Sequence, residues 1–296
     1  MSKTFANAAL PIGSQPTALD PELAPLLEEP FAHVWQRAAP TALGAAVRSR
    51  LLERTAASRT AEAPMTTRRR SRQARQGLAA GVTAQHLYAA PPGRSLRPGE
   101  PTRVRLLEFG VDARLEPQAL GEAPSVPPHR ELLVVAGSVD VQGQTLSQRD
   151  YLVLPAGAPM PALSSAAGAL LFLRESALPS QVGDRPYTVL DAEAGWPSYA
   201  PGIQRRVLWQ REGQAAMLYY TQPGAQVPHH THGHDEECLM VQGELFLDDL
   251  LLQAGDYQLA PAGSAHHITH TDTGVVLYAH GDLDLQFFGA TGAPRS

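Results

Sequence analysis

Histidine and carboxylate side chains are concentrated in one short stretch, PHHTHGHDEECLMVQG, which spans residues 228–243. Seven of the eleven histidines lie between residues 229 and 270, where even scatter would place about one or two. Neutral imidazole and carboxylate groups are ligands for zinc, iron, manganese, nickel and copper. Histidine near its reference pKa of about 6.5 is largely neutral at pH 7. The stretch therefore indicates either a metal site or a solvated, histidine-rich loop, and spacing decides between them.

The positions of these residues along the chain favour a metal site. His230, His232 and Glu236 are all even-numbered, so in an extended chain their side chains can share one face. Cys238 and Met240 continue that face. If the face points into a barrel, the first three residues converge on an ion and the last two line its pocket.

A later stretch, GDYQLAPAGSAHHITH, begins at residue 255 and offers a further ligand. Its Pro-x-Gly turn comes directly before His266, so the turn can deliver one more imidazole from a neighbouring strand. We expect a set of three histidines and one glutamate.

The elements that must position these side chains belong to an internal repeat. ELLVVAGSVDVQGQTLSQRDYLVLPAG, from Glu131, aligns without a gap with ECLMVQGELFLDDLLLQAGDYQLAPAG, from Glu237. The offset is 106 residues throughout, and D-Y-x-x-x-P-A-G is shared in register. We therefore predict two copies of one β domain.

The first copy lacks the ligands. Shifting the four expected ligands by the same offset gives Pro124, Val126, Arg130 and Met160. The first three are not ordinary ligands, and one thioether does not hold a hard divalent ion. The first copy is therefore predicted to keep the fold without the metal.

The composition is that of a soluble globular protein. The 296 residues are 43% hydrophobic and 18% charged, with a net charge of -5, which gives no reason to expect affinity for nucleic acid. No run approaches the about 18 apolar residues that span a bilayer. The single cysteine, Cys238, excludes an internal disulfide and fits a reducing cytoplasm. We expect a cytoplasmic protein with no membrane segment.

The first hundred residues differ from the rest of the chain. A short helix is expected at residues 20–27, before Pro30. A second helix, at residues 41–57, carries Leu43, Val47 and Leu51 on one face, which needs a covering partner. That partner is either another protein or the chain's own β domain.

Residues 59–100 are rich in Arg, Pro and Gly, which predicts a linker. The run RRRSRQAR, residues 68–75, is expected to be a solvated charge run, with nucleic-acid contact as the alternative. From about residue 101, short apolar runs alternate with Gly and Pro, which is typical of an all-β fold.

The histidine-rich stretch resembles the first motif of the cupin superfamily, G-x5-H-x-H-x(3,4)-E-x6-G. Gly224 is followed by five residues and His230, then by one residue and His232. Three residues lead to Glu236, and six more lead to Gly243. Every spacing of the motif is present.

The later stretch resembles the second cupin motif, G-x5-P-x-G-x2-H-x3-N. Gly255, Pro261, Gly263 and His266 stand at the expected spacings. His270 replaces the usual Asn, which is the one departure.

The resemblance implies an all-β fold of two tandem cupin domains (double-stranded β-helix, or jelly roll) with a short α-helical N-terminal extension. The implied divisions are a helical extension at 1–58, a linker at 59–100, a degenerate cupin domain without metal ligands at 101–180 and a metal-binding cupin domain at 195–288.

The resemblance also implies the site. The expected ligands of one divalent ion (Zn, Fe, Mn or Ni) are His230, His232, Glu236 and His266. The residues expected to line the pocket or to support the ligands are His234, Glu237, Cys238, Met240 and His270. Glu237 would replace Glu236 as a ligand if the loop were one residue longer. Cys238 is either a small buried side chain or a redox-sensing thiolate.

Within the superfamily, the chain is similar to the ChrR-like cupins found at the C-terminus of certain anti-sigma factors. The phrases E-E-C-L-x-x-x-G and A-G-D-Y-x-x-A-P-x-G-S-x-H both occur, and the similarity covers residues 195–285 well and 101–175 in weakened form. It implies a regulatory protein that senses a small ligand or oxidant at the metal. The helix at 41–57 would contact a sigma factor or another transcription protein.

Two features leave alternatives open. The H-x3-C-x2-C signature of zinc-type anti-sigma domains is absent, since the first hundred residues contain no cysteine. An Fe(II)- or Mn(II)-dependent dioxygenase acting on a small organic substrate is the enzymatic alternative, and homodimer formation is left open.

Overall fold

A computed structural model describes residues 42–121 and 126–287, with side chains for residues 46–121 and 126–285. The short helix predicted at residues 20–27 and the side chain of Leu43 lie outside the described residues. The chain divides into two compact units, residues 1–56 and 57–296, and both repeats belong to the second.

Helices are few among the described residues. The predicted N-terminal helix is α2 (Ala42–Glu62), which continues beyond residue 57 and ends shortly before Pro64, a residue that disfavours helix. The other helix is the single turn α3 (Asp191–Ala194), and two 3-10 turns are η2 (Arg70–Arg72) and η3 (Pro117–Leu120). No helix of the described part is both long and apolar enough to cross a bilayer.

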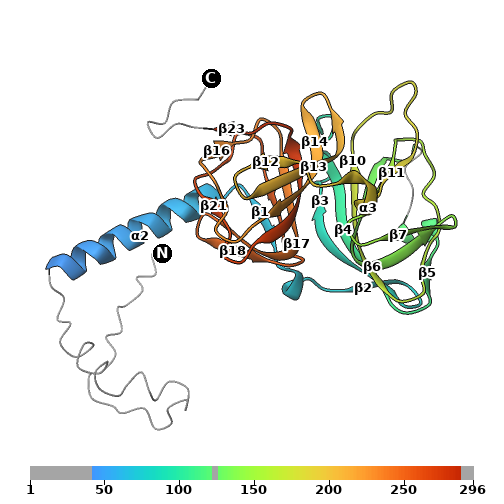
Figure 1. The fold of residues 1–296 in the computed structure, drawn as a ribbon, viewed down its shortest axis with the longest axis horizontal. Helices are drawn as coiled ribbons and strands as arrows, with labels where there is room; N and C mark the ends of the chain where they lie inside the picture. The colour runs from blue at the N-terminus through green and yellow to red at the C-terminus, as the bar shows by residue number, and fades with distance from the viewer. Residues whose placement is uncertain (1–41, 122–125, 288–296) are drawn as a thin grey trace, which may run out of the picture. The chain divides into compact units, whose positions relative to one another are not determined.

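The first repeat forms a ten-stranded antiparallel sheet in the order β11-β8-β6-β10-β4-β3-β2, with β5, β7 and β9 attached beside it. Figure 1 shows these strands in cyan to yellow. Their bounds are β2 (Gln76–Ala79), β3 (Val82–Ala89), β4 (Pro101–Phe109), β5 (Ala113–Leu115), β6 (His129–Val141), β7 (Gln144–Ser147), β8 (Tyr151–Leu154), β9 (Leu163–Ser165), β10 (Ala169–Ser176) and β11 (Tyr187–Val189).

The second repeat has the equivalent order β1-β19-β17-β22-β14-β13-β12, with β15, β18 and β21 attached beside it and a separate small sheet β20-β16-β23. Its strands are β1 (Thr66–Arg68), β12 (Ser198–Ala200), β13 (Ile203–Arg211), β14 (Gln214–Thr221), β15 (Gln226–Val227), β16 (His230–Thr231), β17 (Glu236–Leu247), β18 (Leu250–Gln253), β19 (Tyr257–Ala260), β20 (Ala265–His266), β21 (Thr269–His270), β22 (Val275–Asp282) and β23 (Gln286–Phe287).

The predicted all-β fold of two cupin jelly rolls is confirmed, and the 106-residue offset carries over to three dimensions. Strands β6, β8 and β10 correspond to β17, β19 and β22. Gly137 and Gly243 occupy the same bend, with φ of 73° and 78°. A Cβ at either position would lie 2.2 Å from a facing carbonyl oxygen, so the repeated glycine is a steric requirement.

The predicted linker at residues 59–100 is wrong. Strand β1 pairs with β19 of the second repeat, and β2 and β3 extend the sheet of the first. Conversely, β11 belongs to the segment that leads into the second repeat, and it pairs with β8 of the first repeat. Each repeat therefore receives an edge strand from the segment that precedes the other repeat, which blunts an exposed edge.

The arginine-rich run at 68–75 contacts carboxylates from both repeats. Arg69 pairs with Asp256 at 2.7 Å, and Arg70 and Arg75 lie 3.9 and 3.1 Å from Glu108. The Arg70 backbone N–H also donates to Asp256. Much of this charge is therefore used to hold the segment against the sheets.

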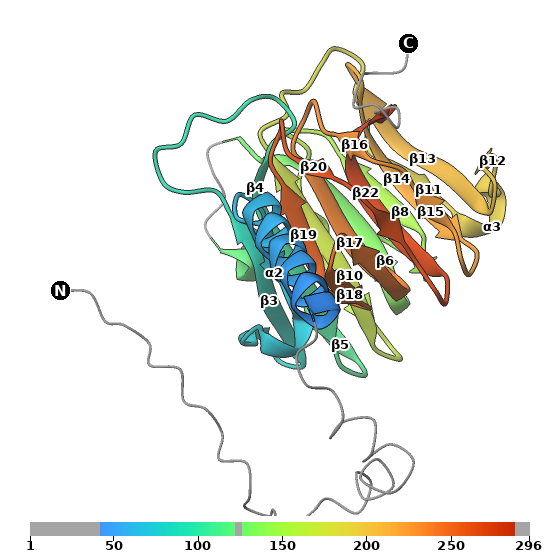
Figure 2. The ribbon, with the colours of Figure 1, turned by 90° about the vertical axis from the view of Figure 1, so that its left-hand side faces the viewer.

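Three apolar cores organise the two repeats. One fills the inside of the first jelly roll and a smaller one lies inside the second. The third joins the facing sides of the two sheets, where Phe172 lies 5.0 Å from Tyr278 between ring centroids. Figure 2 shows β17, β19 and β22 layered against β6 and β10.

A buried polar cluster lies within the third core. The Arg174 guanidinium binds the carboxylates of Glu131 and Glu237, one from each repeat, and the Gly99 carbonyl. Tyr257 donates to Glu237 at 2.7 Å. Glu131 and Glu237 are equivalent under the repeat, so one arginine joins the same position of both copies.

The buried side chain of His280 is expected to make the fold less stable in acid. Burial, together with the nearby Arg174 guanidinium, lowers the pKa of His280 below its usual 6.5. The unfolded chain therefore takes up a proton below about pH 6.5 that the folded chain resists, so stability is present above this pH and is lost as the pH falls.

We expect His280→Asn to reduce the slope of unfolding free energy against pH by up to about 1.4 kcal/mol per pH unit below pH 6.5. Urea unfolding of both proteins between pH 5 and 7.5 measures this slope. Identical slopes for the two proteins would contradict the assignment.

Candidate metal centre

The four predicted ligands come from neighbouring short elements of the second repeat. His230 and His266 are register partners across β16 and β20. His232 follows β16, and its backbone N–H and C=O both bond to the turn at residues 263–264. Glu236 is the first residue of β17. The Pro-x-Gly turn therefore fixes His232 as well as delivering His266.

The side chains converge. Donor atoms of His230, His232 and Glu236 all lie within 4.8 Å of one another. The His266 ring lies 5.7 Å from the His230 ring and 5.2 Å from the His232 ring, between centroids. All four side chains are buried. Three of the four predicted ligands thus form one donor group, and the His266 ring lies beside it.

The donor set fits a divalent ion. Both ring nitrogens of His232 and Nε2 of His266 are buried without a hydrogen-bond partner. Unpaired buried polar atoms are costly, and coordination to an ion would satisfy one nitrogen of each ring. His230 holds its Nδ1 2.8 Å from the Pro228 carbonyl, an interaction that fixes the ring orientation in metal sites.

Asp248 is a supporting residue that the sequence analysis missed. Its carboxylate accepts the backbone N–H groups of His267 and Ile268 at 2.8 and 3.0 Å and lies 3.9 Å from Nδ1 of His266. Burial would raise the pKa of Asp248, but His266 and these backbone groups hold it below its usual value. Asp248 lies in the turn between β17 and β18, and its neighbours in the sequence indicate a turn but not its place beside His266.

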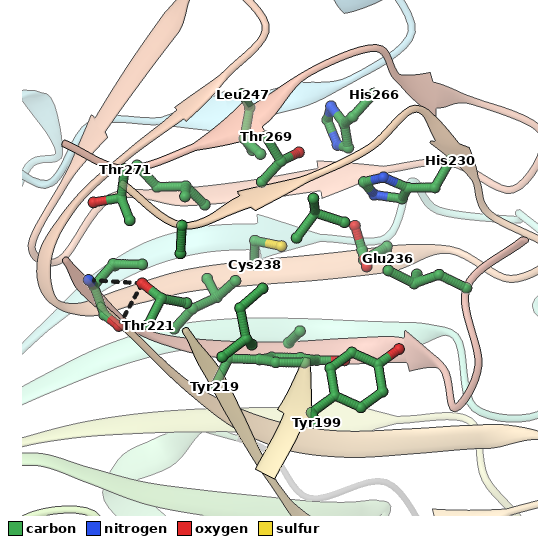
Figure 3. Close-up of a pocket in the computed structure, with 18 residues that line it drawn as sticks. Tyr199, Tyr219, Thr221, His230, Glu236, Cys238, Leu247, His266, Thr269 and Thr271 are labelled. Atoms are coloured by element: carbon green, nitrogen blue, oxygen red, sulfur yellow. Dashed lines mark hydrogen bonds between the residues drawn. The ribbon is translucent and has the colours of Figure 1, made fainter. Parts of the chain in front are cut away.

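A cavity adjoins the donor atoms. Its volume is about 60 Å³, room for a few waters or a small ligand. In Figure 3, His230, His266 and Glu236 lie at one end and Thr221 and Thr271 at the other. The wall is mainly apolar, and its side chains include Ile203, Val227, Leu245, Leu247, Val275, Leu277 and Ala279.

Tyr199 and Tyr219 line one side of the cavity, below Glu236 and Cys238 in the view of Figure 3. The rings of Tyr199 and Tyr219 meet edge to face at 5.9 Å between centroids. The Arg205 guanidinium stacks on Tyr199 at 4.1 Å from the ring centroid. No lysine or arginine lines the cavity among the described residues.

Glu237 was expected in the pocket or as the ligand in place of Glu236, and both expectations are wrong. It alternates to the opposite face of β17, where it binds Arg174 and Tyr257 between the repeats. Met240 is fully buried in the core of the second jelly roll but does not line the cavity.

His234 and His270 were expected to line the pocket or to support the ligands, and both lie outside the cavity lining. His234 contacts Asp282 at 2.5 Å and is partly exposed. His270 stacks on Phe246, with 4.8 Å between ring centroids and 8° between planes. Neither is among the residues that line the cavity.

Cys238 lines the cavity wall near Glu236 (Figure 3). Burial, with the carboxylates of Glu236 and Glu237, raises the pKa of its thiol well above the usual value. The thiol therefore stays protonated at neutral pH, which favours the small buried side chain over a reactive thiolate.

Among its described residues, the first repeat has no equivalent of the site. Arg130, at the position of Glu236, forms an ion pair with Glu175. Val126 is exposed, and Pro124 lies outside the described residues. The cavity is also filled, since Leu132 and Leu173 stand where the second repeat has Cys238 and Ala279 and are packed in the first core.

Comparisons with known proteins agree with this architecture. Residues 185–284 match the family model of the ChrR Cupin-like domain. A sequence search of the curated proteins gave no match.

Three solved structures are similar in fold. A candidate dioxygenase from Nostoc punctiforme shares 13% identity over 78% of this chain and 87% of its own, with a TM-score of 0.58. A mutant of the Bacillus subtilis oxalate decarboxylase OxdC shares 14% over 73% and 76%, with a TM-score of 0.52. The bacterial pirin YhhW of Escherichia coli, in complex with nickel(II), shares 11% over 73% and 98%, with a TM-score of 0.52.

At these identities the solved structures establish the fold, and the family model establishes the type of the second domain. The two fused jelly rolls, the paired motifs and the converging donors agree with both. Residues 185–284 therefore form a ChrR-like cupin domain, and the two repeats together have the fold of a bicupin.

Proposed function

We propose that this chain is a metal-binding regulatory cupin in which a small ligand or oxidant at a divalent ion changes binding to a transcription protein. The observation that carries the proposal is the buried donor set at the end of a mainly apolar cavity. Under this proposal, His230, His232, Glu236 and His266 hold the ion. A cytoplasmic location is part of the proposal and rests on the single cysteine.

The cavity lining sets the class of ligand. Its wall is mainly apolar and lacks basic side chains among the described residues, so a dianion would be poorly compensated. The ligand is therefore a small molecule with an apolar body and at most one negative charge. The ion would supply Lewis acidity and would anchor oxygen atoms of such a ligand, while Tyr199 and Tyr219 contact its body.

Ala279→Leu tests the ligand pocket separately from the metal. Leucine stands at the equivalent Leu173 of the first repeat, where it fills the core, so the fold accommodates it. We expect the variant to bind metal as the native protein does and to bind acetylacetone, a small apolar chelator, at least about tenfold more weakly. Isothermal titration of the metal-loaded proteins measures this difference, and equal affinities would contradict the assignment of the cavity.

The partner surface in this proposal is α2. Val47, Leu51 and Leu52 are 49%, 58% and 60% exposed on this helix. Exposed apolar side chains at this spacing fit a helix-mediated contact with another protein. A sigma factor is the partner proposed, because the second domain is of the ChrR type.

Binding of the metal-loaded chain to purified sigma factors of the same organism tests the partner. We expect one of them to form a stable complex that is lost with Val47→Glu combined with Leu51→Glu. Ala46→Glu, which lies on the side of the helix away from Val47, Leu51 and Leu52, is the matched control and should retain the complex. If no sigma factor binds, or if the double variant binds as the native chain does, the regulatory proposal fails.

An Fe(II)- or Mn(II)-dependent dioxygenase is the second candidate. Four protein ligands on an octahedral ion leave two positions for a substrate or for O2, and the cavity beside the donors favours this possibility. Oxygen uptake by the Fe(II)-loaded protein with β-diketones, flavonols and thiols tests it. Substrate-dependent uptake that disappears in Glu236→Ala would place the enzyme ahead of the regulator.

A further inference from the structure

The end of the first repeat that corresponds to the metal site carries an arginine cluster. Arg103 and Arg105 come from β4, Arg130 from the start of β6 and Glu175 from the end of β10. Arg130 corresponds to Glu236 in the repeat. Glu175 corresponds to Gly281, where a Cβ would lie 3.3 Å from atoms of Glu236. The cluster therefore occupies the place of the metal site.

Positive charge exceeds negative charge in this cluster. Glu175 accepts from Nε of Arg103 at 2.5 Å and from Nε of Arg130 at 2.9 Å. Its carboxylate lies 3.5 Å from Nη2 of Arg105, an ion-pair contact without a hydrogen bond. Three guanidinium groups thus share one carboxylate, which leaves two positive charges uncompensated among the described residues.

Arg105 has two N–H groups without a hydrogen-bond partner among the described residues. Its side chain is 2% exposed, and Nη1 donates to the Leu120 carbonyl at 3.1 Å. Nε and Nη2 are buried and have no hydrogen-bond partner. These two N–H groups lie on one edge of the guanidinium plane, which matches the two oxygens of a carboxylate.

Arg174 shows how the same fold satisfies a buried arginine. Its guanidinium donates to two carboxylates and one backbone carbonyl, whereas Arg105 has one carbonyl acceptor and a shared carboxylate. Burial and the neighbouring Arg103 lower the pKa of Arg105 to about 10. The described residues therefore leave part of the donor capacity of Arg105 unfilled.

We propose that the first repeat binds a small carboxylate-bearing molecule at this cluster, with both carboxylate oxygens on Nε and Nη2 of Arg105. Arg103 is 31% exposed, so the cluster reaches solvent on its side. Under this proposal the first repeat has replaced a metal site by an anion site. The two repeats then bind ligands by different chemistry.

Acetate is the probe. The full-length chain, from which a chelator has removed any metal, is titrated by calorimetry at constant ionic strength, with sodium chloride as the control titrant. We expect saturable binding of one acetate per chain in the native protein. Arg105→Gln, which removes the edge, should weaken this binding by about tenfold or more. His230→Ala, which alters the metal centre alone, should leave it unchanged.

Arg105→Lys serves as a second variant if Arg105→Gln does not fold. Lysine keeps the charge and lacks the two-pronged edge, so the same loss of about tenfold is expected. The proposal is overturned if the native chain binds no acetate, if both arginine variants bind it as well as the native chain, or if His230→Ala abolishes the binding. It is also overturned if phosphate binds at the cluster and acetate does not.

Discussion

Replacement of Arg174 by methionine is expected to lower the free energy of unfolding by about 3–5 kcal/mol. The side chain is 1% exposed and lies between Glu131 and Glu237, which are equally buried. Without the guanidinium, two carboxylates stay in the interface between the repeats with no cation of fixed charge beside them. Urea unfolding of the metal-free protein, followed by circular dichroism, measures the loss.

Two controls separate charge from packing. Arg149→Met removes an arginine whose partner Asp191 is at a similar distance, 2.7 Å, but is partly exposed, so a cost of only about 0–1 kcal/mol is expected. Adding Glu131→Gln and Glu237→Gln to Arg174→Met should recover most of the stability. A cost for Arg174→Met as small as that for Arg149→Met would show that the cluster does not hold the repeats together.

Replacement of His232 by alanine is expected to weaken divalent metal binding by more than about 100-fold. Four-ligand zinc sites are worth about 10–16 kcal/mol, so one ligand contributes about 3 kcal/mol or more. Both nitrogens of His232 are buried without a hydrogen-bond partner, and His232 is one of the three residues whose donor atoms lie within 4.8 Å of one another. Competition with a zinc-binding dye measures the affinity.

His234→Ala is the matched control for this change. His234 is two residues away along the chain, but it contacts Asp282 and lies outside the cavity lining. Its loss should change metal affinity by less than about tenfold. Equal losses for the two variants would mean that the ion does not bind where the donor atoms converge.

The repeat and the ligand spacing could be predicted from the sequence because each is visible within continuous stretches of the chain. The parity of His230, His232 and Glu236 follows from extended backbone, and the fixed offset carries each strand of one copy onto the other. The same alternation of side chains between the two faces of a strand also applies to Glu237. Its odd number places it on the opposite face of β17, so its assignment to the pocket contradicted the pattern that located Glu236.

The remaining features depend on contacts between distant segments. Residues 76–89 form β2 and β3 because they pair with each other and with β4, whereas the stretch 59–100 in which they lie is rich in Arg, Pro and Gly and predicts a loop when taken alone. Arg174 and Glu237 are 63 residues apart and belong to different repeats. No local pattern marks such a pair, nor the arginine cluster that replaces the metal site.

Elemental analysis of the purified chain tests the central claim most directly. We predict about one divalent ion per chain in the native protein and close to none in the His230→Ala, His266→Ala double variant, while Arg130→Ala in the first repeat leaves the count unchanged. Circular dichroism of the double variant shows whether it is still folded. Two ions per native chain, or an ion retained by the folded double variant, would contradict the assignment of a single metal centre to the second repeat.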